Sequence, residues 1–75
     1  MAIFTVRAHW DADAGVWWAE SDEVPGLVAE AAAHDDLVAE LKALVPELLA
    51  LNLPAHAGGN QLRIVSDRVE ELSAA

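Results

Sequence analysis

The apolar residues of this chain follow two different spacings, and the change between them constrains the fold more than any other feature. Up to residue 31, apolar and polar residues alternate, which is typical of strands with one buried face. From residue 35 to residue 51, apolar residues recur every three or four positions, as on one face of a helix. Alternation returns over residues 61–67. The spacing therefore predicts three strands, one helix and a fourth strand.

The first three strands are predicted to be joined by short turns. Residues 3–10 and 16–21 form the first two strands, and residues 11–15 form a hairpin loop between them. Residues 22–26 end in a Pro-Gly pair, which is typical of a turn, and residues 27–31 follow as a short third strand. Such an arrangement is an antiparallel meander. Its inward-facing residues are predicted to be Phe4, Val6, Ala8, Trp10, Trp17 and Ala19.

The predicted helix spans residues 35–51 and ends before Pro54. Asp35 and Asp36 lie in its first turn, where negative charge suits the helix dipole. Pro46 lacks an amide hydrogen, so it should kink the helix or start a second short one. The apolar stripe comprises Leu37, Leu41, Leu44, Leu48 and Leu51, widened by Val38, Val45 and Leu49.

These elements predict an α+β fold of order β-β-β-α-β, with a single helix on one face of a four-stranded sheet. The helix is long enough for a crossover connection, so the third and fourth strands should be parallel. Residues 1–69 form one domain, and residues 70–75 a flexible C-terminal tail.

The face that the helix cannot cover is predicted to be a partner-binding or oligomer interface. Trp17 and Trp18 are adjacent, so they point to opposite faces of the sheet and one of them faces away from the helix. An apolar surface that contains tryptophan is typical of an interface. The residues expected on it are Ile3, Thr5, Arg7, Val16, Trp18 and Val28.

The charge of the chain favours some partners over others. Thirteen acidic residues against four basic ones give a formal net charge of −9. This charge repels a phosphate backbone, so direct nucleic-acid binding is not expected, whereas a basic protein would be attracted. The absence of cysteine excludes disulfides and thiolate metal sites. With no signal peptide and no apolar run of membrane-spanning length, we expect a cytoplasmic protein.

The sequence gives little support to catalysis or to a metal or cofactor site. His9, Asp11 and Asp13 could offer ligands to a divalent ion, but a hairpin loop also needs aspartates for turn hydrogen bonds, and we favour that interpretation. The inward positions of the first strand carry none of the carboxylates that a two-metal nuclease needs. No serine has a recognisable His and Asp arrangement around it. We therefore expect no enzyme activity and no cofactor.

Residues 19–28, with the sequence Ala-Glu-Ser-Asp-Glu-Val-Pro-Gly-Leu-Val, resemble the HicB-like antitoxin superfamily, as does the aromatic second strand before them. The resemblance covers residues 3–66 and looks closest to a short, uncharacterised branch of that superfamily. It implies a partial RNase H-like fold. It also implies an antitoxin that binds a small basic HicA-like ribonuclease toxin and blocks its active site.

Two features depart from the family pattern. Members often carry a C-terminal DNA-binding segment for autoregulation, and these 75 residues contain none, so autorepression by this chain alone is not expected. Ala33 stands where members commonly have the Ser or Thr that caps the helix.

Three functions remain open at the level of sequence. The first is a homo-oligomeric antitoxin-type protein that binds a basic toxin through the uncovered sheet face and the acidic tail. The second is an orphan RNA-binding domain in which an exposed aromatic residue stacks on unpaired bases. The third is a structural homo-oligomer without catalytic activity.

Overall fold

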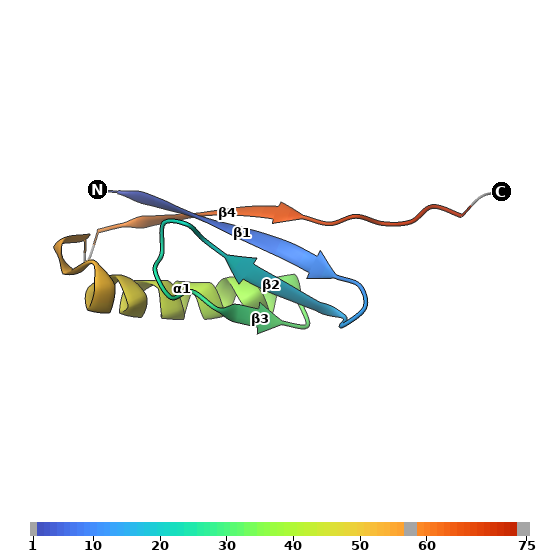
Figure 1. The fold of residues 1–75 in the computed structure, drawn as a ribbon, viewed down its shortest axis with the longest axis horizontal. Coiled ribbons are helices and arrows are strands. Elements are labelled where there is room, and N and C mark those ends of the chain that lie inside the picture. Colours follow the sequence, from blue (N-terminus) through green and yellow to red (C-terminus); the bar gives the residue numbers. More distant parts are fainter. Residues whose placement is uncertain (1, 57–58, 74–75) are drawn as a thin grey trace.

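The computed structural model describes residues 2–56 and 59–73 and has the element order β-β-β-α-β that the sequence predicts (Figure 1). The fold is α+β, with one helix on one face of a four-stranded sheet. Residues 74 and 75 of the predicted tail lie outside the described residues. The elements are β1 (Ile3–Asp11), β2 (Val16–Glu20), β3 (Ala29–Ala31), α1 (His34–Asn52), the 3-10 turn η1 (Pro54–His56) and β4 (Gln61–Asp67).

The strands lie in the order β3-β2-β1-β4. β1 pairs with β2 in antiparallel orientation, with Trp10 opposite Trp17, and β2 pairs with β3 in the same way. β4 pairs with β1 in parallel orientation, with Val6 opposite Ile64. β3 and β4 therefore run in the same direction, as the crossover predicts, but they lie at opposite edges of the sheet. The first strand of the chain becomes one of the two central strands.

The core lies between α1 and the sheet face that carries Val6 and Trp17. Four helix residues at four-residue spacing are buried: Leu37, Leu41, Val45 and Leu49. Leu44 and Leu48 are partly buried beside them. The prediction that Leu51 belongs to the buried stripe is wrong, because its exposure is 78%. Leu51 is two residues beyond Leu49, which is about 200° around the helix, so it points away from the core.

Several element boundaries differ from the predicted ones, since β1 extends to Asp11 and α1 spans His34–Asn52. α1 continues without a break through Pro46, so this proline does not start a second helix. β3 begins at Ala29, and residues 27–28 precede it as irregular chain. β2 ends at Glu20 rather than Ser21. Ala33 is the N-cap of α1 and makes no side-chain cap hydrogen bond.

The helix covers the sheet unevenly. A helix is about 10 Å across and strands lie about 4.8 Å apart, so one helix covers roughly two of four strands. α1 comes closest to β3 and β2. Leu62 and Ile64 of β4 are consequently only half-buried, although they face the same side of the sheet as the core. A groove of about 840 Å³ lies between α1 and the first half of β4.

Candidate protein-binding surface

The surface opposite α1, here called the outer face, is centred on Trp18. Strand pairing places Trp18 between His9 of β1 and Glu30 of β3. The His9 and Trp18 rings are 4.5 Å apart between centroids and are tilted by 34°. Trp18 is 40% exposed, whereas its neighbour Trp17 is buried in the core. The alternation of the second strand therefore places one tryptophan on each face, as predicted.

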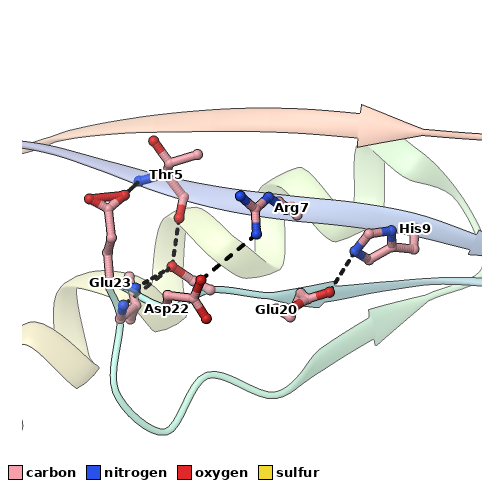
Figure 2. Close-up of polar contacts among 8 residues, drawn as sticks. Thr5, Arg7, His9, Glu20, Asp22 and Glu23 are labelled. Carbon is pink, nitrogen blue, oxygen red and sulfur yellow. Dashed lines mark hydrogen bonds and ion pairs between the residues drawn. The ribbon is translucent and has the colours of Figure 1, made fainter.

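A hydrogen bond holds His9 beside this tryptophan. His9 Nε2 lies 2.8 Å from Oε2 of Glu20 on the neighbouring strand, and Figure 2 draws this contact as a dashed line. The imidazole ring is thus fixed by Glu20 on one side and by Trp18 on the other. This arrangement limits the rotation of the Trp18 side chain, so less entropy is lost when a partner covers it.

β2 does not extend far enough to pair with Thr5 of β1, and side chains of the loop after β2 supply these hydrogen bonds instead. Ser21 Oγ donates to the carbonyl oxygen of Thr5 at 2.6 Å and accepts from the amides of Glu23 and Val24. The Thr5 amide donates to Oε1 of Glu23 at 2.8 Å (Figure 2). Both backbone groups of Thr5 are therefore satisfied without β2. This is why β2 ends at Glu20 and the chain can turn toward its Pro-Gly pair.

We expect Ser21→Ala to lower the free energy of unfolding by roughly 1–3 kcal/mol, because it removes three hydrogen bonds and leaves the Thr5 carbonyl without its partner. Chemical denaturation of the purified variant measures the change. Ser73→Ala is the matched control, since Ser73 is exposed beyond the last strand. Equal stability of the two variants would show that the Ser21 hydroxyl contributes nothing.

The structure does not gather the six predicted interface residues into one patch. Val16 and Trp18 lie together on β2, and Arg7 is two pairing positions from His9 on the same face. Val28 precedes β3 and is 82% exposed. Thr5 is half-buried, and its backbone is bound by the loop after β2. Ile3 is six residues from His9 along β1, about 20 Å away, and lines the groove beside α1 instead.

Carboxylates outnumber cations on and around the outer face. Arg7 lies 3.8 Å from Asp22 Oδ2, an exposed pair that contributes little to stability but reduces the free positive charge (Figure 2). Arg63 on β4 is the other arginine of this face, opposite Thr5. The carboxylates are Asp11, Glu20, Asp22, Glu23, Glu30 and Asp67. The exposed tryptophan is therefore surrounded by negative charge.

The hairpin loop uses Asp11 as a turn residue. Asp11 Oδ1 accepts hydrogen bonds from the amides of Asp13 and Ala14 at 3.1 and 3.2 Å. Gly15 closes the turn with a φ of 69°, and its amide donates to the Asp11 carbonyl. Across residues 2–56 and 59–73, no three His, Asp or Glu side chains are grouped in a way that could hold a metal ion.

Sequence reasoning missed the part that His9 and Glu20 play beside Trp18. The sequence suggests His9 as a possible metal ligand and assigns no interface role to Glu20. The available signal was the two-residue period, which places both on the same face as Trp18. Their contact also depends on the register that sets His9 opposite Trp18, and the hairpin loop alone did not fix that register.

A family model described as a domain of unknown function, DUF1902, matches residues 3–73. The chain belongs to the DUF1902 family. Its fold is also that of a crystal structure of hypothetical protein TTHA1013 from the extremely thermophilic bacterium Thermus thermophilus, with a TM-score of 0.81 and 46% sequence identity. The match covers 93% of this DUF1902 chain and 99% of that one. No significant match was found among curated proteins.

The single long helix of the DUF1902 fold is a packing helix. Among residues 2–56 and 59–73, no helix is both long enough and apolar enough to cross a membrane. The buried side of α1 carries leucine and valine, and its exposed positions carry mostly charged residues and alanine.

Proposed function

We propose that this chain is a HicB-like, antitoxin-type protein-binding module that sequesters a small basic ribonuclease of the HicA type. The observation that carries the proposal is Trp18, which is partly exposed and held by His9 within an acidic sheet face. The resemblance of residues 19–28 to HicB-like antitoxins supports the same role.

The chemistry of the outer face suits a partner rich in lysine and arginine. An exposed tryptophan provides a large apolar contact area and attracts cations to the face of its ring. Glu20 follows Trp18 by two residues on β2 and Glu30 lies opposite it on β3, where their carboxylates can accept hydrogen bonds from an arginine. A ribonuclease binds RNA with basic residues, so an acidic surface that covers those residues also excludes its substrate.

The same features disfavour RNA as the ligand of this face. Base stacking on Trp18 would bring phosphates next to Glu20 and Glu30, and Arg7 is already paired with Asp22. An exposed aromatic residue without free cations around it lacks the electrostatic part of single-strand binding.

The test is calorimetric titration with the small basic ribonuclease encoded beside the gene for this chain, at low and high salt. We expect a complex that weakens as salt rises, and loss of RNA cleavage at stoichiometric amounts of this protein. A gene neighbourhood without such a ribonuclease, or a folded protein that does not bind it at low salt, would overturn the proposal.

A matched pair of variants locates the contact. Glu30→Lys changes the outer face, and Glu40→Lys makes the same charge change on the exposed side of α1. We expect Glu30→Lys to weaken binding about tenfold, and Glu40→Lys to weaken it far less. Equal losses would mean that net charge alone drives association. Quenching of tryptophan fluorescence by a short single-stranded RNA at low salt would favour the RNA-binding alternative instead.

A further inference from the structure

We propose that two copies of this chain pair through the free edge of β4, and that the extended segment after β4 of each copy lies against the groove of the other. This segment, residues 68–73, is called the arm. The inference goes beyond the proposed function, because it concerns an edge of the sheet instead of the outer face, and a second copy of the chain as the partner.

The arm is an unusual segment for a monomer to expose. It continues the direction of β4 past the end of the sheet, and the molecule is 54 Å long but only 19 and 18 Å in its other dimensions (Figure 1). Val69 and Leu72 on the arm are 81% and 92% exposed. The start of the arm is fixed, since the Arg68 guanidinium lies 4.2 Å from the centroid of the Trp10 ring. An extended apolar segment held away from its own core is suited to contact another molecule.

The free edge of β4 is the better of the two sheet edges for pairing. Among the described residues, β4 pairs with β1 alone and β3 with β2 alone. β3 has three residues, and its central one is Glu30, so it is a short and charged edge. β4 has seven residues and continues into the arm. A longer edge presents more unpaired amide and carbonyl groups to a second strand.

The groove matches the arm in both apolarity and charge. Its floor includes Leu62 and Ile64, which α1 leaves half-covered, and its walls include Lys42 and Arg63. The chain has only four lysines and arginines. Arg7 and Arg68 form ion pairs, whereas within the described residues Lys42 and Arg63 form none. Two free cations beside an apolar floor fit an acidic apolar strand.

The arm has that character. Continuing the two-residue period of β4 into the arm places Leu72 on the same side as Arg68, which is the core side, and Glu71 on the same side as Arg63. Glu70 pairs with Arg68 within the same arm. The arm cannot reach its own groove without reversing direction, because β4 carries it away from residues 59–64, which line that groove. A second copy in antiparallel orientation places its arm at the groove of the first copy.

One register satisfies these contacts together. Antiparallel pairing of two β4 edges about a twofold axis at Asp67 sets Leu72 opposite Leu62, Glu71 opposite Arg63 and Val69 opposite Val65. Apolar and opposite-charge cross-strand pairs stabilise a sheet, and each pair occurs twice in the dimer. The two Asp67 carboxylates meet at the axis, and this like-charge pair opposes the association.

The oligomeric state is measured on the full chain by sedimentation over a range of concentrations. We expect a dimer, and we expect Leu72→Glu to raise its dissociation constant by at least about tenfold. Glu71→Lys and Arg63→Glu should each weaken the dimer, and the double variant should restore it, because the charges are exchanged but still paired. Trp18→Glu is the control on the outer face and should leave the dimer intact.

Crosslinking tests the register separately. Residues 63 and 71 lie about 26 Å apart along one extended chain, so a disulfide between them must join two copies. Because the chain lacks cysteine, Arg63→Cys with Glu71→Cys should yield a covalent dimer on mild oxidation, and Asp36→Cys with Glu71→Cys should not. A monomer at all concentrations, or a dimer that Trp18→Glu dissociates and Leu72→Glu does not, would overturn the inference.

Discussion

Leu37→Ala is expected to lower the free energy of unfolding by roughly 2–5 kcal/mol. Chains of this length usually have a total stability of about 4–11 kcal/mol, so the variant should unfold at much lower denaturant concentration or fail to fold at room temperature. Leu37 is fully buried near the start of α1. Its removal leaves a cavity in a small core that has no disulfide to support it.

The matched control is Leu51→Ala on the same helix. It makes the same chemical change at a position that is 78% exposed, so it should alter stability by less than about 0.5 kcal/mol. Both variants are compared with the wild type by urea denaturation followed by circular dichroism. Similar losses in the two variants would mean that Leu51 is buried in solution, for example by a partner.

Trp18→Ala is expected to weaken binding of the basic partner by about 30-fold or more, which corresponds to the loss of at least about 2 kcal/mol at an interface hot spot. The indole is the largest partly exposed side chain of the outer face and is already held by His9. Calorimetric titration with the ribonuclease measures the change. Trp18→Phe should restore part of the affinity, because it keeps an aromatic ring at this position.

The control for this variant is Val28→Ala. Val28 is 82% exposed and precedes β3, so its truncation removes apolar area without touching the tryptophan. We expect a change in affinity of less than about threefold for a residue outside the hot spot. If Trp18→Ala remains folded and binds as tightly as Val28→Ala, the outer face is not the contact surface, and the proposed function loses the observation that carries it.

The two-residue period was sufficient to predict which side of the sheet each strand residue occupies. It placed Trp17 toward the helix and Trp18 away from it, and the exposures confirm both positions. The change to helical spacing likewise predicted α1. The spacing alone left two lines of apolar residues on the helix, and packing buried the one that ends at Leu49, so Leu51, about 200° around the helix from it, is exposed.

The order of strands could not be read from the sequence. The crossover predicted that β3 and β4 are parallel, but it did not say that β4 would pair with β1 at the far edge. The groove beside α1 and the free edge of β4 both result from the pairing of β4 with β1 at the far edge of the sheet. The contacts of Ser21 were also hidden, because a serine hydroxyl that replaces strand pairing leaves no periodic signal.

The pairing of β1 with β4 also joins residues 3–9 to residues 61–67, which are far apart in the sequence. During synthesis, residues 3–52 leave the ribosome first and can form the meander and helix. One edge of β1 stays unpaired until residues 61–67 follow. Non-local pairing of this kind slows folding and exposes an unpaired strand until it is complete. The nascent chain therefore carries an open edge at β1 until residues 61–67 have left the ribosome.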